Sequence, residues 1–267
     1  MSPLSVVSWN VNSVRVRLSQ VAAVLAETQP DVVCLQETRV ADGSFPAKAF
    51  AEMGYAHQAL YGMKTHNGVA VLARRPFRAV ERYAWCGQRD CRHIAVRLAE
   101  GPWLHNLYIP AGGDVPDPES NPRFAHKLDF LDALTAWFAG AGTPREPAIL
   151  VGDLNVAPLP TDVWSHEKML KVVSHTPPEV ARLDSLADAA SWVDAVRHVI
   201  PPREHLYTWW SYRTRDWKAG NRGRRLDHAW VTPDLAPAIR DAFTRPETRD
   251  WERPSDHIPV GLSLDGG

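Results

Sequence analysis

The sequence predicts an α/β protein in which two packed β-sheets carry helices on their outer faces. Short apolar runs bounded by turn residues recur along the chain, and only a few helical patterns lie between them. The chain has 267 residues, of which 45% are hydrophobic, and this suits one sizeable core. No stretch is long enough or biased enough in composition to be a linker. We therefore expect residues 1–267 to form one domain.

Apolar runs of strand length account for the predicted sheets. Each run is rich in aliphatic or aromatic residues and is bounded by residues that favour turns, as buried strands usually are. The predicted strands are Leu4–Trp9, Asp31–Gln36, Gly68–Ala73, His93–Leu98, Trp103–Ile109, Ala148–Val151, Leu226–Val231 and Ile258–Leu264. So many strands beside so few helices favour two sheets over one.

Two segments have the apolar spacing of helices. In Arg123–Phe138 one face carries apolar side chains at helical intervals, namely Phe124, Leu128, Leu131, Leu134 and Phe138. Pro122 precedes this segment, and proline is common at the first position of a helix. A second helical pattern fits Val14–Ala26.

Composition disfavours membrane and secreted classes of protein. No apolar run approaches the ~20 residues of a membrane-spanning helix, and no charged-then-apolar leader stands at the N-terminus. Cys34, Cys86 and Cys91 form neither a disulfide framework nor a metal-ligand spacing. We therefore expect a cytoplasmic monomer with no membrane partner.

The segment from Arg203 to Arg225 departs from the near-neutral average charge. The formal net charge of the chain is −1, but this segment holds seven Lys or Arg residues against two acidic ones, Glu204 and Asp216. The aromatic residues interleaved with these cations are Tyr207, Trp209, Trp210, Tyr212 and Trp217. A charge run alone is usually a solvated surface loop. Cations that hold phosphates, together with rings that stack on bases or sugars, also suit a nucleic-acid partner.

Short polar clusters stand at the ends of the predicted strands. Their chemically capable members are Asn10, Glu37, Tyr108, Asp153, Asn155, Asp227, Asp256 and His257. Taken singly, an Asn or Asp at a strand end is usually a turn residue bonded to its own backbone. A lone Glu is usually solvated, and a lone His is more often structural than catalytic. Together they form a set that loops on one edge of a scaffold could bring into one site.

This set suits the hydrolysis of a phosphodiester with a hard cation. Mg²⁺ prefers oxygen ligands, keeps several of its waters, and needs only one or two protein carboxylates beside a substrate phosphate. The sequence has no Cys/His spacing typical of zinc and no Gly-rich phosphate-binding loop after a strand. We therefore expect Mg²⁺ as the cofactor, with Mn²⁺ as a substitute.

At this point a resemblance to a known family becomes specific. The motifs SWNVN at 8–12, LQET at 35–38, LYIP at 107–110, GDLNVAP at 152–158, NRGRRLD at 221–227 and SDHIPV at 255–260 occur in the order found in exonuclease III. They span nearly the whole chain, which therefore resembles the exonuclease III family of the endonuclease/exonuclease/phosphatase superfamily. The stretch YTWWSYR at 207–213 resembles the repair-nuclease branch rather than a lipid or inositol-phosphate branch.

The resemblance implies both the fold and the activity. The fold would be an α/β four-layered α/β/β/α sandwich, with two mixed β-sheets flanked by helices and the site at one edge. The activity would be that of a magnesium-dependent phosphodiesterase of base excision repair. Such an enzyme acts on double-stranded DNA, cleaving 5′ of abasic sites and removing nucleotides or blocking groups from 3′ ends.

The resemblance also implies a role for each residue that matches a family motif. Glu37 would be the main metal ligand with Asn10 and Asp256 close by, and Asp153, Asn155 and His257 belong to the same implied metal site. Asp153 would be the general base, Asn155 would orient water or phosphate, and Tyr108 would bond the phosphate or the leaving oxygen. His257 would contact the scissile phosphate while Asp227 pairs with it, which should favour the charged imidazole.

Substrate choice is expected to lie in the loop from Trp209 to Leu226. Family members take a flipped-out, baseless sugar into an apolar pocket, and Trp209 and Leu226 match its wall. Arg222 and Arg224 are expected to contact DNA phosphates. Arg224, however, stands where family members carry an apolar residue, and Ala111 replaces an amide-bearing residue that would bond a phosphate.

Two rival interpretations remain open from the sequence. The first is another enzyme of the superfamily that acts on sphingomyelin, inositol phosphates or RNA. The second is a catalytically inactive DNA-binding or scaffold protein, although Glu37, Asp153 and His257 are all present. The sequence does not divide the activity among abasic cleavage, 3′-phosphatase and exonuclease, and it does not decide between one and two metals.

Overall fold

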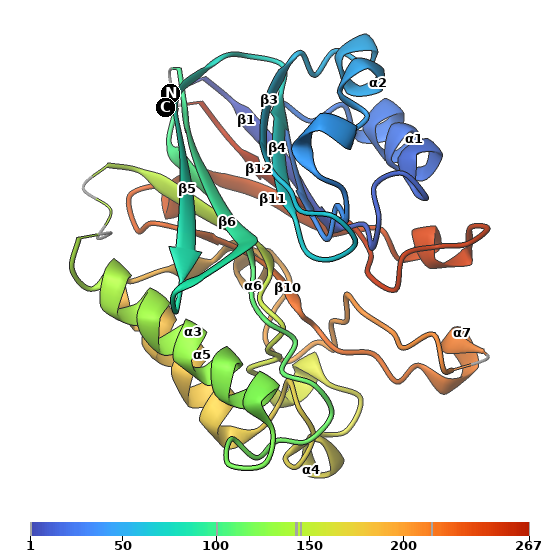
Figure 1. Ribbon diagram of the computed structural model, residues 1–267, viewed down its shortest axis with the longest axis vertical. Helices are drawn as coiled ribbons and strands as arrows, with labels where there is room; N and C mark the ends of the chain where they lie inside the picture. The colour runs from blue at the N-terminus through green and yellow to red at the C-terminus, as the bar shows by residue number, and fades with distance from the viewer. Residues whose placement is uncertain (1, 100, 142–143, 145, 215, 267) are drawn as a thin grey trace.

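The computed structural model describes residues 2–266 except 100, 142–143, 145 and 215. Arg215, one of the cations counted in the basic segment, therefore lies outside the described residues. The described chain forms two six-stranded β-sheets that face each other and carry helices on their outer sides (Figure 1). This arrangement confirms the predicted four-layered sandwich.

The first sheet gathers the N-terminal strands and the last two strands of the chain. Its members, in spatial order, are β11 (Ile239–Thr244), β12 (Val260–Leu264), β1 (Leu4–Asn10), β2 (Val32–Gln36), β4 (Val69–Ala73) and β3 (His57–Tyr61). β1 and β2 run parallel, while β12, β4 and β3 pair with their neighbours antiparallel. The sheet is therefore mixed, as expected.

The second sheet is built mainly from the middle of the chain. Its members, in spatial order, are β5 (Phe77–Trp85), β6 (Gln88–Leu98), β7 (Trp103–Tyr108), β8 (Ala148–Asp153), β10 (Asp227–Val231) and β9 (Val193–Asp194). β7 and β8 run parallel and lie unusually close at Gly152, where a Cβ would stand 1.9 Å from the carbonyl oxygen of Leu107. Only glycine fits there, which accounts for the first residue of the GDLN motif.

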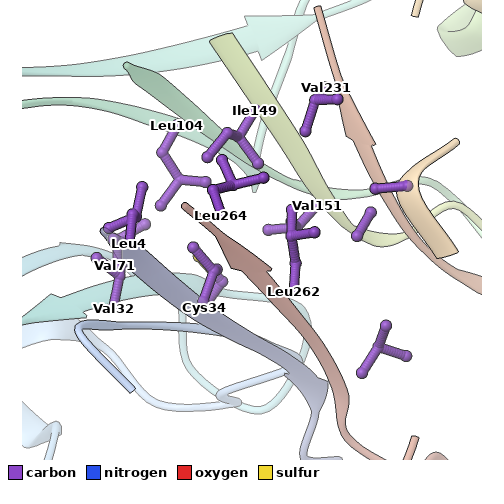
Figure 2. Packing of buried hydrophobic residues seen from close by; sticks show 14 of the residues in the cluster. Leu4, Val32, Cys34, Val71, Leu104, Ile149, Val151, Val231, Leu262 and Leu264 are labelled. Atoms are coloured by element: carbon purple, nitrogen blue, oxygen red, sulfur yellow. The ribbon is translucent and has the colours of Figure 1, made fainter. Parts of the chain in front are cut away.

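The main hydrophobic core lies between the two sheets. Figure 2 shows Cys34 and Leu262 of the first sheet among Leu104, Ile149 and Val151 of the second, and all of them are buried. Such close packing of aliphatic side chains from both inner faces holds the two sheets at a fixed separation. The strand ends of both sheets are thereby fixed relative to one another.

Helices cover the two outer faces. α1 (Leu18–Thr28) and α2 (Ala47–Glu52) lie on one side of the paired sheets, and α3 (Pro122–Phe138) and α5 (Pro177–Ala189) lie on the other (Figure 1). The short helices are α4 (His166–Met169), α6 (Ala195–Val199) and α7 (Trp217–Gly220). None of the helices in the described ranges is long and apolar enough to cross a bilayer.

The predicted long helix is confirmed. α3 begins at Pro122, and the side chain of Asn121 caps it by accepting a hydrogen bond from the backbone N–H of Arg123. The apolar face predicted from the spacing is buried along its whole length, at Phe124, Leu128, Leu131, Leu134 and Phe138.

The prediction of a helix from Val14 was wrong at its start. α1 begins at Leu18, because the preceding residues are held by other partners. The N–H of Val14 donates to the carbonyl of Thr38, and the guanidinium of Arg17 donates to Pro254 O at 3.0 Å. These contacts tie the segment to the loop after β2 and to the loop before β12.

The strands that the sequence did not predict lie mostly at sheet edges. β3 and β11 are only partly buried, and β5 has an alternating, largely exposed face. Their polar residues interrupt the apolar runs on which the prediction depended. The eight predicted strands are all present, with ends shifted by a few residues.

Candidate active site

A cleft of about 380 Å³ opens at one edge of the sandwich, where strand ends of both sheets meet. Its polar lining includes most of the residues that the sequence singled out: Glu37, Tyr108, Asp153, Asn155, Trp209, Arg224, Leu226, Asp256 and His257. Asn10 and Asp227 are buried directly behind this lining and bond to it. Arg222 is exposed and stands apart from the cleft lining.

Strand register brings the carboxylates together. Asp153, the last residue of β8, lies opposite Asp227 on antiparallel β10 and opposite Tyr108 on parallel β7. The backbone N–H of Asn155 donates to Asp153 Oδ1 at 3.0 Å, and Asn10 Nδ2 donates to Asp153 Oδ2 at 2.9 Å. Asp153 is thus held from both sheets at once.

Burial shapes the acidity of Asp153. Desolvation raises the pKa of this carboxyl, the neighbouring His257 opposes that rise, and Asp227 adds to it. A carboxylate with a raised pKa is a stronger proton acceptor than an ordinary surface Asp. Asp153 therefore has the properties of a general base.

His257 lies between two carboxylates. Its Nδ1 is 2.8 Å from Asp227 Oδ2, and its Nε2 is 3.5 Å from Asp153 Oδ2. Burial alone would lower the pKa of His257, but the negative charges of Asp227 and Asp153 outweigh it and raise the pKa to about 10. The ring therefore carries a positive charge at neutral pH, with Nδ1–H donating to Asp227.

Further hydrogen bonds hold His257 and Asp227 in place. Thr208 Oγ1 donates to Asp227 Oδ2 at 2.6 Å, and the indole of Trp9 donates to the carbonyl of His257 at 3.0 Å. Asp227 Oδ1, by contrast, has no hydrogen-bond partner among the described residues although it is buried. A buried carboxylate oxygen left unpaired is costly unless a cation or donor completes it.

Glu37 stands at the end of β2 in a left-handed backbone conformation, with φ of +49°. Its Oε1 accepts hydrogen bonds from Asn10 Nδ2 at 3.0 Å and from Tyr108 Oη at 2.9 Å, while Oε2 accepts from Arg39 Nε at 2.9 Å. A non-glycine residue at positive φ is uncommon and is found disproportionately at functional sites. The strained turn aims this carboxylate into the cleft.

Tyr108 remains a phenol at neutral pH. Burial raises the pKa of its hydroxyl well above the usual value, and the charges of Glu37 and Asp153 raise it further. It can therefore donate a hydrogen bond to an anionic substrate but does not itself supply a negative charge.

The donor set fits a hard divalent cation. Ligand atoms of Asp153, Asp227 and His257 lie within 4.8 Å of one another. Glu37 lines the same cleft, and Asp227 Oδ1 is buried without a hydrogen-bond partner among the described residues, so both carboxylates could contribute to such a site. Carboxylate oxygens without a thiolate suit a hard divalent cation.

Asp256 is held on the opposite wall of the cleft. Its Oδ2 accepts from the indole of Trp209 at 2.9 Å, and its Oδ1 accepts from Asn12 Nδ2 at 3.0 Å. Burial would raise the pKa of Asp256, but His257 and these two donors lower it. Asp256 therefore stays ionised, with each of its oxygens already accepting one hydrogen bond.

The two adjacent tryptophans face different ways in a segment that forms isolated β-bridges at Trp209 to Arg224 and His257. Trp209 lines the cleft beside Leu226. Trp210 is buried and donates its indole N–H to Asn221 Oδ1 at 3.1 Å. The cleft thus has an apolar wall at the position that the sequence predicts for a sugar pocket.

The basic segment is not one continuous cationic surface. Arg222 is exposed, and its guanidinium lies 4.9 Å from the ring of Trp164. Arg225 is fully buried and bonds Asp162 and Asp194, which makes it a structural residue. Arg224 points into the cleft, where its guanidinium lies 4.9 Å from the ring of Trp209.

Sequence reasoning missed several residues that shape the site. Thr208 and Asn12 bond the two carboxylates named above, and Arg39 bonds Glu37. Asn12 and Thr208 stand within or beside quoted motifs, which is the signal that could have found them. Lys127 and Glu179 form a fully buried ion pair behind Asn155 and carry no such signal.

Comparison with known proteins agrees with this geometry. The family model described as "Endonuclease/Exonuclease/phosphatase family" matches residues 7–257. Exodeoxyribonuclease III of Haemophilus influenzae is 29% identical over 263 residues, which cover 95% of this chain and 97% of that protein.

Two solved structures are similar over almost their whole length. A 3′ phosphatase from Neisseria bound to a product DNA hairpin is 33% identical, with a TM-score of 0.90, and covers 98% of this chain and 100% of its own. An AP endonuclease from Archaeoglobus fulgidus is 31% identical, with a TM-score of 0.90 and the same coverage.

Proposed function

Because this chain belongs to the endonuclease/exonuclease/phosphatase family, and to its exonuclease III branch, we propose that it is a magnesium-dependent DNA repair nuclease. Its substrates are double-stranded DNA with abasic sites, which it cleaves 5′ of the lesion, and DNA 3′ ends. The observation that carries this proposal is the buried cluster of Asp227, His257 and Asp153, of which Asp153 and His257 line one cleft together with Glu37.

The residues around Asp153 suit the attack of water on phosphorus. Asp153 takes a proton from the water whose oxygen forms the new bond to phosphorus, while the bond to the 3′ oxygen breaks on the opposite side. Asn155, bonded to the carbonyl of Ile109 at 2.9 Å, fixes the loop that orients this water. Much of the rate then comes from placing the base within hydrogen-bond reach of the water.

His257 and Tyr108 stabilise the negative charge on the reacting phosphate. The charged imidazole offers Nε2–H to a phosphate oxygen, and Asp227 is a positioning residue that keeps Nδ1–H occupied and the ring protonated. The phenol of Tyr108 offers a further hydrogen bond. Donors fixed in advance in a buried site stabilise a charged transition state more than they would in water.

Glu37, which lines the cleft, would hold Mg²⁺, and Asn10 would orient its carboxylate by donating Nδ2–H to Oε1. When bound, the ion neutralises charge on the phosphate and acidifies coordinated water. Arg39 and Tyr108 already fix the orientation of the Glu37 carboxylate.

DNA is held outside the cleft by exposed cations and inside it by the apolar wall. Arg222 contacts a phosphate, and Trp209 with Leu226 faces the extruded sugar of an abasic site. An abasic nucleotide is cheap to extrude because no base has to be unstacked or unpaired.

One duplex with a central abasic analogue tests the proposal. It is incubated with the full-length protein in Mg²⁺ or in EDTA, and the products are resolved by length. We expect incision on the 5′ side of the analogue together with erosion from the 3′ end, both abolished by EDTA.

Phosphate esters of lipids, inositol phosphates and single-stranded RNA serve as competing substrates in the same buffer. Faster hydrolysis of any of these than of the duplex would overturn the assignment to DNA repair. Tight DNA binding without metal-dependent cleavage would indicate the inactive scaffold instead.

A further inference from the structure

Arg224 is a half-buried cation whose guanidinium makes only two hydrogen bonds to described residues, both through Nη1. Its Nη1 donates to the carbonyl of Val173 and to Ser174 Oγ, each at 3.0 Å. Its Nε is buried and has no hydrogen-bond partner in the described ranges. The guanidinium lies against the ring of Trp209 and lines the cleft that contains Asp153 and His257.

Its neighbour Arg225 shows what a structural arginine requires in this fold. Arg225 bonds Asp162 through Nε at 2.8 Å and Nη2 at 3.0 Å, and Asp194 through Nη1 at 2.7 Å. For Arg224, no carboxylate of a described residue forms an ion pair; burial lowers the pKa of its guanidinium, and the charge of Glu179 only partly opposes this. A partly desolvated charge without a directly bonded counter-ion would be stabilised by an anion that enters the cleft.

Arg224 is held in place by a rigid support. Ser174 is fixed because both carboxylate oxygens of Glu179 accept its backbone N–H at 2.9 Å. Glu179 is paired with the buried Lys127, whose ammonium also donates to the carbonyl of Asn155 at 2.7 Å. The position of Arg224 is thereby coupled to the loop that follows Asp153, next to the reacting phosphate.

We propose that Arg224 makes this cleft a subsite for the extra negative charge of a 3′-terminal phosphate, so that the protein removes 3′-phosphates faster than it incises abasic sites. This inference rests on the proposed function. It concerns whether the same site prefers a 3′-terminal phosphate or an internal abasic site, a choice that the family assignment leaves open.

The chemistry of the two substrates differs at the position of Arg224. A phosphomonoester carries about −1.5 to −2 charges at neutral pH, whereas an internal diester carries one. In the monoester a third anionic oxygen occupies the place where a diester continues into the next sugar. Arg224 adds a cation to the same cleft, beside the apolar wall formed by Trp209 and Leu226, where it would favour the additional negative charge of the monoester.

The reaction itself is ordinary hydrolysis. A water oxygen bonds to phosphorus, the bond between phosphorus and the 3′ oxygen breaks, and that oxygen takes up a proton. The products are inorganic phosphate and a DNA 3′-hydroxyl, with no co-reactant other than water.

Two DNA hairpins of equal length test the inference, one ending in a 3′-phosphate and one carrying an internal abasic analogue. Single-turnover rates in Mg²⁺ give a ratio of phosphate removal to abasic incision. Arg224→Leu should lower this ratio about 10- to 100-fold, the range of one lost charged hydrogen bond. Arg224→Lys, which keeps the charge, should fall between Arg224→Leu and the wild type.

Arg222→Leu is the matched control, because it removes an equal charge two residues away but outside the cleft. It should weaken binding of both hairpins alike and leave the ratio unchanged. A ratio that falls equally in Arg222→Leu would overturn the inference, since general electrostatics would then explain the preference.

A binding measurement separates the subsite from protein stability. In EDTA the wild type should bind the 3′-phosphate hairpin more tightly than the same hairpin with a 3′-hydroxyl, and Arg224→Leu should lose that difference at an unchanged melting temperature. Equal affinities in the wild type would overturn the inference even if the variant failed to fold. Absence of metal-dependent cleavage of both hairpins would instead overturn the proposed function.

Discussion

The contact between His257 and Asp227 gives the sharpest quantitative prediction. Asp227→Asn keeps the shape of the side chain and can still accept the hydrogen bond from Thr208, which lies 2.6 Å away. It removes the negative charge that lies 2.8 Å from His257 Nδ1. His257→Gln removes the charged ring from the same place, and the double variant closes the cycle.

The size of the effect follows from the geometry. Both side chains are almost fully buried, and the bond between them joins two charged groups. Such hydrogen bonds are worth about 1.5–3 kcal/mol, or about 10- to 150-fold in rate if the contact acts in the transition state. Each single variant should lose at least that much. The double variant should lose little more than His257→Gln alone, because Asp227 acts through the imidazole.

Single-turnover cleavage of an abasic duplex at saturating Mg²⁺ supplies the four rates. DNA affinity measured in EDTA should change by far less than the rates, since the pair acts on the reacting phosphate rather than on the duplex. If the double variant loses the product of the two single losses, the residues act independently and the positioning role of Asp227 is refuted.

Three further predictions follow from other parts of the molecule. Glu37→Ala should reduce cleavage by orders of magnitude at low Mg²⁺ and recover partly at high Mg²⁺ or Mn²⁺, and an unchanged rate at low Mg²⁺ would contradict its role. Arg222→Gln should reduce the slope of log affinity for duplex DNA against log salt by about 0.9, whereas an unchanged slope would mean that it meets no phosphate. Burial lowers the pKa values of His105 and His228 to about 4, so the unfolded chain binds more protons below pH 6.5. The raised pKa values of Asp153 and His257 act in the opposite direction over this range, so each histidine is tested against its own variant. Between pH 7 and pH 5 the free energy of unfolding of the wild type should fall by about 2 kcal/mol more than that of His105→Gln or His228→Gln in denaturant titrations, and equal falls would contradict the burial of these histidines as neutral rings.

Much of the fold was predictable because its signals are local. Buried strands such as β2 and β4 are continuous apolar runs, and α3 repeats its apolar residues at helical spacing. The edge strands β5 and β11 were not predictable in this way. They are strands because a neighbouring strand pairs with them, and their own sequences alternate or expose polar residues.

In the site, too, some contacts were predictable from local sequence and others were not. Asp153 and Asp227 come together because they end and begin paired strands, so their juxtaposition follows from strand position. The different environments of Arg224 and Arg225 do not follow from their positions in the sequence, because both are cations in one basic run. Arg225 is buried since Asp162 and Asp194, distant in sequence, lie beside it, while Arg224 points into the cleft. Contacts of that range are absent from any local pattern.

Asp153→Asn tests the central claim most directly, because an amide cannot accept the proton of the attacking water. Cleavage of the abasic duplex is measured across a titration of Mg²⁺, with the wild type and Glu37→Ala alongside. The account predicts a loss of about 10²- to 10⁴-fold or more in Asp153→Asn that no concentration of metal restores, with DNA affinity retained. If raised Mg²⁺ restores Asp153→Asn but not Glu37→Ala, or if Asp153→Asn cleaves at the wild-type rate, Asp153 is not the base and the account is wrong.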